Sequence, residues 1–140
     1  MTVVIDTNVV LSMFTLGHRA RPVFSAWLNG RLHWAVSTGI LLEYEEIVAE
    51  RSGVDRVQKM FELIEVVGQQ HGNVLQIAPS FRFHLIVADP DDDKFADCAI
   101  AAGADWIITE DRHFDALKNS GHQPQPVTPE EFIRRHLGGA

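Results

Sequence analysis

The sequence predicts an α/β sandwich around a mainly parallel β-sheet, and three observations support this fold class. Short runs rich in β-branched residues alternate along the chain with longer segments of helical periodicity, which is typical of βαβ units. The first such run, Val3–Ile5, is continuously apolar, as expected of a strand buried on both faces. The 140 residues, 46% hydrophobic and 22% charged, match the size and composition of one globular domain.

Each element is expected from its periodicity and from the residues that flank it. Short apolar runs between turns predict strands over residues 3–5, 32–36, 74–77, 106–109 and 126–127. Helical spacing predicts helices over residues 9–14, 22–28, 54–67 and 92–102, a helix from Ser37 or Thr38 through Val48, and a last helix that closes at Gly138. Residues 79–88 have no clear pattern and are interpreted as a loop.

Capping residues fix several of these boundaries. Each residue of Asp6-Thr7-Asn8 is able to cap the first helix. Gly103 ends the predicted helix over residues 92–102. Thr128-Pro129-Glu130-Glu131 is a capping box with proline at the first helical position, and Arg134 and Arg135 suit the last turn.

The composition excludes several classes of protein. The single Cys98 excludes an internal disulfide and a multi-cysteine metal site. The seven histidines lack the spacing of a zinc motif, so we expect no native zinc site. Apolar runs stay well below the ~18 residues of a membrane span, and the N-terminus has no basic region. We therefore expect a cytoplasmic protein that does not associate with membranes.

The net charge of −7 bears on possible ligands, because nine of the nineteen acids fall between Asp89 and Asp115. A negative chain does not attract nucleic acid through counterion release. If it binds phosphates, bound divalent cations are the usual means of inverting the local field. The alternative is that the acids only keep a small protein in solution.

Four carboxylates occupy positions where the sequence pattern predicts burial, which disfavours a charged side chain. Asp6 directly follows the first apolar run, and Asp111 lies two residues beyond the run that ends at Thr109. Both belong at the carboxyl edge of a parallel sheet, where sites form. Asp97 interrupts an otherwise apolar helix, and Glu43 borders the apolar stripe of the third helix. A buried carboxylate must be paired, protonated or bound to a metal.

These acids also have purely structural interpretations. Asp6 or Asn8 is able to cap the first helix, and Asp111 is able to cap a short helix around residues 114–116. A solvated turn and helix start is the simplest interpretation of three further acids: Asp89, Asp91 and Asp92.

Position along the helices leaves further alternatives open. Glu45 borders the stripe of the third helix as closely as Glu43 does. Asp93 lies four residues before Asp97, so the two point the same way, which mildly destabilises a helix unless a cation lies between them. Lys94 is the best structural partner for Asp97. Together, the four carboxylates predict one acidic pocket whose oxygen ligands select Mg²⁺ or Mn²⁺ and suit phosphoryl chemistry.

Six motifs occur in a characteristic order along the chain. They are Val4-Ile5-Asp6-Thr7-Asn8-Val9, Ser37 to Glu43-Tyr44-Glu45-Glu46, Asp89-Pro90-Asp91-Asp92-Asp93-Lys94-Phe95-Ala96-Asp97-Cys98-Ala99, Gly103-Ala104-Asp105, Thr109-Glu110-Asp111 and Thr128-Pro129-Glu130-Glu131-Phe132. Over essentially the whole chain, this set resembles the PIN-domain family, and specifically the compact VapC-like toxin components of bacterial toxin–antitoxin pairs. Glu110, where glycine is common, and Ala96, where a larger apolar residue is usual, depart from the pattern.

The resemblance implies a three-layer sandwich with a five-stranded parallel sheet, and one PIN-like nuclease domain over residues 1–140. It implies Mg²⁺- or Mn²⁺-dependent hydrolysis of single-stranded RNA, neutralisation by a cognate antitoxin protein, and a homodimer. The resemblance assigns three sets of residues: Asp6, Glu43, Asp97 and Asp111 as catalytic, Asp6, Asp93, Asp97 and Asp111 as metal ligands, and Asn8 and Thr109 as supporting residues.

Our hypothesis for the mechanism is in-line attack of water on phosphorus, which leaves a 5′-phosphate and a 3′-hydroxyl. Asp6, Asp97 and Asp111 would hold one Mg²⁺, with Glu43 orienting or deprotonating the water. Candidate phosphate contacts are Arg19, Arg21, Arg82 and Arg112.

Three other functions deserve comparison. A catalytically silent PIN-like module would bind RNA or protein without needing four repelling acids. Phosphatases that form an aspartyl-phosphate need an acid two residues after the nucleophile, where this chain has Asn8. Phospho-receiver domains need a lysine after a late strand, and no lysine closely follows residues 106–109.

Overall fold

The computed structural model describes residues 1–78, 93–119, 121 and 123–138, and these form five strands interleaved with helices. The strands are β1 Thr2–Ile5, β2 His33–Val36, β3 Val74–Gln76, β4 Trp106–Ile108 and β5 Gln125–Val127. The helices are α1 Thr7–Met13, α2 Arg21–Leu28, α3 Thr38–Ser52, α4 Val54–His71, α5 Asp93–Ala102, the 3₁₀ helix η2 Arg112–Asn119, and α6 Pro129–His136. The loop expected at residues 79–88 lies outside the described residues.

All five strands run parallel in one sheet, in the order β3-β2-β1-β4-β5. β1 lies at the centre, where Val3 pairs with Trp34 on one side and Trp106 on the other. Ile108, the last residue of β4, pairs with Ile5 of β1 and with Val127 of β5. The carboxyl ends of these three strands therefore meet at one edge of the sheet.

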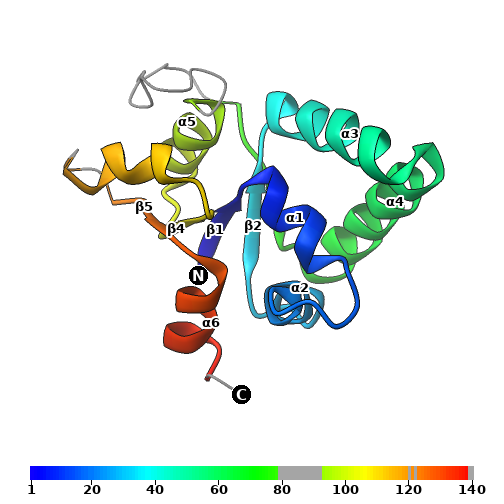
Figure 1. The fold of residues 1–140 in the computed structure, drawn as a ribbon, viewed down its shortest axis with the longest axis horizontal. Helices are drawn as coiled ribbons and strands as arrows, with labels where there is room; N and C mark the ends of the chain where they lie inside the picture. Colours follow the sequence, from blue (N-terminus) through cyan, green and yellow to red (C-terminus); the bar gives the residue numbers. More distant parts are fainter. Residues whose placement is uncertain (79–92, 120, 122, 139–140) are drawn as a thin grey trace.

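The helices flank this sheet, so the predicted three-layer α/β sandwich is confirmed (Figure 1). α5 packs on β1, β2 and β4, and η2 packs against β5. α1 packs against α2 and α3, and α3 and α4 form the most extensive helix pair, on the side of the sheet away from β5.

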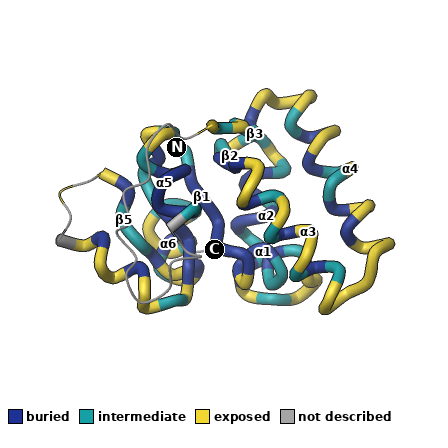
Figure 2. Tube along the Cα trace, turned by 90° about the horizontal axis from the view of Figure 1, so that it is seen from above, coloured by how far each residue is buried: buried dark blue, intermediate teal, exposed yellow. Residues whose placement is uncertain are grey.

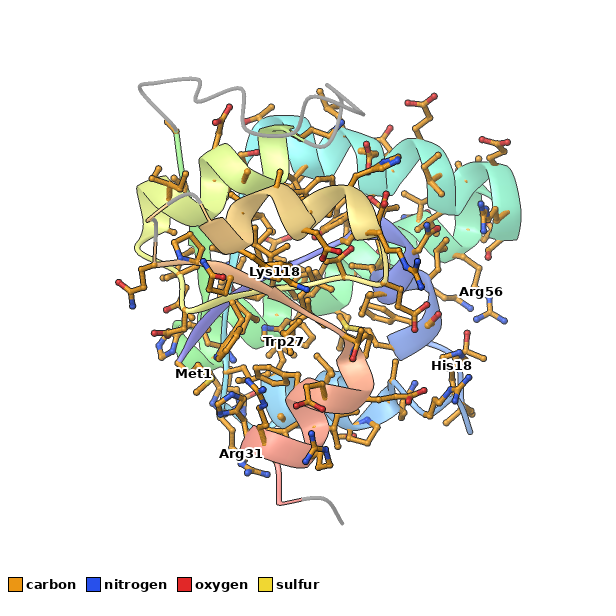
Figure 3. All side chains as sticks on the ribbon, turned by 60° about the vertical axis from the view of Figure 1, so that its left-hand side comes forward. Met1, His18, Trp27, Arg31, Arg56 and Lys118 are labelled. Carbon is orange, nitrogen blue, oxygen red and sulfur yellow. The ribbon has the colours of Figure 1, made fainter. Side chains whose placement is uncertain are left out.

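The core forms where side chains of the central strands meet the inner faces of the helices. Buried stretches follow β1, β2 and α5, whereas α4 alternates between buried and exposed residues (Figure 2). Trp27 lies inside the molecule, and Arg56 lies at its periphery (Figure 3). The buried Asn73 stabilises this arrangement, because its side-chain amide donates to the carbonyl oxygens of Trp27 (2.8 Å) and Leu32 (3.1 Å).

Most helix boundaries agree with their expected caps. Ser37, rather than Thr38, caps α3, because its hydroxyl accepts from the amide of Ile40 at 3.3 Å. Thr128 caps α6 by accepting from the amide of Glu131 at 3.2 Å. The carboxylate of Glu131 pairs with Arg134 and Arg135, and both interactions lower its pKa.

Several helices extend beyond the residues that periodicity predicts, α3 for example to Ser52 instead of Val48. α4 ends at His71 instead of Val67. Its last turn is helical, but the residues of that turn are not buried and therefore add nothing to the apolar pattern from which the helix was predicted. Gly72 stops it with a left-handed backbone conformation, φ +63°. α1 begins at Thr7 instead of Val9, because Asp6 acts as its N-cap. Among the described residues, no helix is long and apolar enough to cross a membrane.

Candidate acidic site

The candidate site lies where β1 and β4 end side by side. The sheet hydrogen bonding continues one residue beyond each strand: the amide of Asp6 donates to the carbonyl of Ile108 at 3.0 Å, and that of Thr109 donates to Val127 at 2.9 Å. The backbone pairing therefore places Asp6 and Thr109 next to each other, although 103 residues separate them in the chain.

Asp6 is buried, with 6% of its surface exposed, and both of its carboxylate oxygens are engaged. One oxygen accepts from the Thr109 hydroxyl at 2.8 Å, and the other accepts from the amide of Thr7 at 2.8 Å. The second bond caps α1, so the structural interpretation of Asp6 is correct. It does not exclude a chemical role, because the same carboxylate faces the other acids of the site.

The surroundings of Asp6 raise its pKa. Burial is the largest cause, and the negative charges of Glu43 and Asp111 add to it, whereas the hydrogen bonds from Thr109 and Thr7 lower the pKa. The charges of Glu43 and Asp111 therefore act on Asp6, as expected if the three carboxylates share one site. A cation at this place would favour the ionised form of Asp6.

Asp111 is linked to Asp6 through Thr109. The Thr109 hydroxyl accepts from the amide of Asp111 at 3.0 Å while it donates to Asp6. The Asp111 carboxylate accepts from the amide of His113 at 2.9 Å, at the start of η2, so its predicted capping role is also present. Glu110, which departs from the family pattern, is exposed.

Glu43 reaches the site from α3, and the structure distinguishes it from Glu45. Glu43 is partly buried and accepts a short hydrogen bond from the hydroxyl of Thr7, whereas Glu45 is exposed. The other carboxylate oxygen of Glu43 lies 2.6 Å from Lys94 Nζ. Lys94, expected as a partner for Asp97, therefore forms an ion pair with Glu43.

Asp97 is also buried, with 6% of its surface exposed, and belongs to the helix that packs across β1, β2 and β4. Its neighbour Cys98 is buried, and burial, aided by the charge of Asp97, raises the thiol pKa to about 12. The thiol is therefore protonated at neutral pH and is a core residue. Asp93 begins α5, but its side chain lies outside the described part, as do four other candidates: Arg82, Asp89, Asp91 and Asp92.

The residues fit a hard divalent cation in their chemistry. Asp6, Glu43 and Asp111 supply carboxylate oxygens, the ligands that Mg²⁺ and Mn²⁺ prefer, and their mutual repulsion disfavours the ionised form of Asp6. Across residues 1–78, 93–119, 121 and 123–138, no three Asp, Glu, His or Cys side chains are spaced to hold a metal ion.

An open cavity of about 650 Å³ adjoins the site. Thr109, Glu110 and Asp111 line one part of it, and its other charged side chains are the cations Arg112, Lys118 and Arg135 and the acids Asp115 and Glu131. The cavity therefore carries both signs of charge at the end of β4, where Lys118 pairs with Asp115 and Arg135 with Glu131.

The other residues predicted from the sequence lie in varied surroundings. Asn8 is exposed. Arg19 forms an exposed ion pair with Glu130 at 2.6 Å, and Arg21 donates to the carbonyl of Phe14 at 3.0 Å. Sequence reasoning missed the contacts that Thr7 and Lys94 make with Glu43 and the place of Lys118 beside the site. The position of Thr7 directly after Asp6 was a signal, but it was interpreted only as a possible helix cap.

The fold and the site define a parallel α/β protein with carboxylates gathered at the carboxyl edge of its sheet. The sequence matches the model of the PIN domain over residues 2–113, and the chain therefore belongs to the PIN-domain family. No curated protein matches it. Among solved structures, it is similar to a crystal structure of VapBC2 from Rickettsia felis bound to a DNA fragment from their promoter, with a TM-score of 0.59. That match has 16% sequence identity and covers 90% of this chain and 98% of the other.

Proposed function

We propose that this chain is a metal-dependent endoribonuclease that hydrolyses single-stranded RNA, with residues 1–140 as one PIN-like nuclease domain. The observation that carries the proposal is the linked group of Asp6, Thr109 and Asp111, with Glu43 close enough to affect the pKa of Asp6. Membership of the PIN-domain family supports nuclease chemistry for such a group.

Each residue has a proposed role. Asp6, Asp97 and Asp111 would hold Mg²⁺ or Mn²⁺, with Asp93 as an additional acid. The bound metal would supply Lewis-acid activation of water and neutralise charge on the phosphate. Glu43 would orient or deprotonate the water, and Thr109 orients Asp6 through its hydrogen bond. Asn8 would support the first aspartate, as the motif predicts.

The cationic side chains beside the site are the candidate contacts for the phosphates of an RNA substrate. The chain carries a net charge of −7, so phosphates must be bound by cations near the site rather than by the molecule as a whole. Arg112, Lys118 and Arg135 line the cavity that begins at Thr109 and Asp111. We propose that phosphates flanking the scissile bond bind there, and that Arg112 is the phosphate contact among the arginines expected from the sequence.

We also propose that the protein is the toxin of a toxin–antitoxin pair, that a cognate antitoxin binds it, and that it forms a homodimer. The similarity to VapBC2, whose structure contains a DNA fragment from their promoter, supports a partner of this kind. A second cavity of about 430 Å³, between α1 and the α3–α4 pair, offers apolar side chains such as Leu11, Phe14 and Leu63 to an apolar segment.

The proposal is tested by incubating the purified protein with fluorescent single-stranded RNA in Mg²⁺, in Mn²⁺ or in EDTA. We expect cleavage with either metal and none with EDTA, with products that carry 5′-phosphates. Binding should be measured separately by fluorescence anisotropy. RNA binding without cleavage in any metal would contradict the proposal and favour the catalytically silent module.

Thr109→Val is expected to lower the rate of RNA cleavage about 10–100-fold. It removes the hydroxyl that donates a hydrogen bond to Asp6 and accepts one from the amide of Asp111. The valine keeps the shape of threonine, so the fold should persist. Single-turnover assays at saturating Mg²⁺ measure the effect. Thr109→Ser keeps the hydroxyl and should stay within about threefold of the unmodified protein; equal losses in both variants would assign the effect to packing.

A further inference from the structure

A lysine ammonium already lies against the candidate acidic site. Lys94 Nζ is 2.6 Å from Glu43 Oε1, and the two side chains are only 29% and 22% exposed. The lysine belongs to α5 and the glutamate to α3, and these two helices pack against each other. The ion pair therefore joins two elements of the site rather than lying on the open surface.

The carboxylate that Lys94 contacts is part of the hydrogen-bonded group at the end of β1. The second oxygen of Glu43 accepts from the hydroxyl of Thr7, whose amide donates to Asp6. His113 Nδ1 lies 3.3 Å from Asp111, but it carries a positive charge only when protonated. Lys94 thus supplies a permanent positive charge to a group whose acids otherwise repel one another.

The stem of Lys94 passes close to the first turn of α3, because a Cβ atom built on Gly39 would lie 3.7 Å from Lys94 Cδ. The ammonium lies 5.8 Å from the centre of the Phe95 ring. Both neighbours agree with a side chain that lies toward α3, where it pairs with Glu43.

We propose that Lys94 is a built-in counter-ion of the site: its ammonium neutralises Glu43, beside the carboxylates proposed as metal ligands, and so lowers the affinity of the site for a divalent metal ion. This inference rests on the proposed function, because the metal is the cofactor of that function. A divalent ion and an ammonium repel each other when they lie near the same carboxylate. A metal ion held by Asp6 and its neighbours is therefore repelled by Lys94, and it gains little from the charge of Glu43 while that carboxylate is paired with Lys94.

The test compares Mn²⁺ affinity in proteins stripped of metal with EDTA and then dialysed. Lys94→Met keeps most of the stem and removes the charge, whereas Lys94→Arg keeps the charge. Lys59→Met is the matched control, because Lys59 is an exposed lysine of α4. We expect the Kd for Mn²⁺, measured by titration calorimetry and by electron paramagnetic resonance, to fall about tenfold in Lys94→Met. Lys94→Arg and Lys59→Met should stay within about twofold of the unmodified protein.

Different outcomes overturn different claims. An unchanged or weaker Mn²⁺ affinity in Lys94→Met, with clear binding by the unmodified protein, overturns the counter-ion role and leaves the proposed ribonuclease intact. Absence of Mn²⁺ binding in all proteins overturns both. Circular dichroism verifies the fold of each variant. Lys94→Gln, which removes the charge but keeps hydrogen-bond donors, provides the same comparison should Lys94→Met fail to fold.

Discussion

Asp6→Asn is expected to lower the rate of RNA cleavage at least about 1000-fold while the protein stays folded. Loss of a ligand for the metal removes several kcal/mol of transition-state stabilisation, and each 1.36 kcal/mol corresponds to a factor of ten. Asparagine has nearly the same shape, and its amide group is able to keep contacts with Thr7 and Thr109. Cleavage assays under single-turnover conditions with excess Mg²⁺ measure the loss.

The same substitution is expected to leave the metal-free protein as stable as before, or more stable. The folded-state pKa of Asp6 is raised, so the folded protein holds more protons than the unfolded chain between the unfolded and folded pKa values. Stability therefore falls as the pH rises through that window, and ionised Asp6 destabilises the metal-free fold at neutral pH. The Asp6→Asn substitution removes this pH dependence. Urea unfolding in EDTA at several pH values tests both statements.

Asp55→Asn is the matched control for this experiment. Asp55 is exposed in the first turn of α4, so the same chemical change should leave cleavage unaltered and reduce stability by no more than about 0.5 kcal/mol. A large loss of metal-free stability in Asp6→Asn would contradict the electrostatic account. It would mean that the carboxylate is a structural partner of its neighbours in the fold.

Phe95→Ala is expected to lower the free energy of unfolding by about 3–5 kcal/mol, the usual result of truncating a buried phenylalanine. Phe95 is fully buried, and its ring lies between Tyr44 and Phe114, with centroid distances of 6.5 and 6.3 Å. The substitution leaves a cavity beneath α5, the helix that carries Lys94 and Asp97. Thermal and urea unfolding monitored by circular dichroism measure the loss.

Leu42→Ala serves as the control, because Leu42 is 59% exposed on α3. It should change stability by less than about 0.5 kcal/mol. A loss of stability as small as this in Phe95→Ala would mean that the core between α5 and the sheet repacks to fill the space left by the ring. We also expect Phe95→Ala to impair cleavage at temperatures where it remains folded, because the position of α5 then varies.

The fold was predictable because its signals are local. Val3–Ile5 is apolar on both faces, and the alternation of strands and helices leads directly to a parallel sheet. Errors arose at helix ends such as His71, where hydrogen bonding extends beyond the last apolar position. Hydrophobic periodicity detects only the buried face of a helix, so it cannot reveal an exposed last turn.

The site was predictable in part. Asp6 and Asp111 were found because strands carry them to a known edge, and Thr109 joins them as the pattern implied. Helical periodicity left open whether Glu43 or Glu45 faces the site, since both border the same apolar stripe. The family resemblance assigned Glu43, and in the structure it is Glu43 that contacts Thr7. The ion pair of Lys94 was unpredictable, because it depends on how α5 packs against α3 and not on spacing within either helix.

The hydrogen bond between Thr109 and Asp6 has a consequence for protein synthesis. These residues lie 103 positions apart, so a ribosome must translate the chain through β4 before Asp6 meets its partner. A nascent chain that ends before β4 carries the first aspartate without the threonine or the last aspartate beside it. Truncated products of interrupted translation therefore lack the assembled centre, and the proposed RNA cleavage requires synthesis of the chain through Asp111.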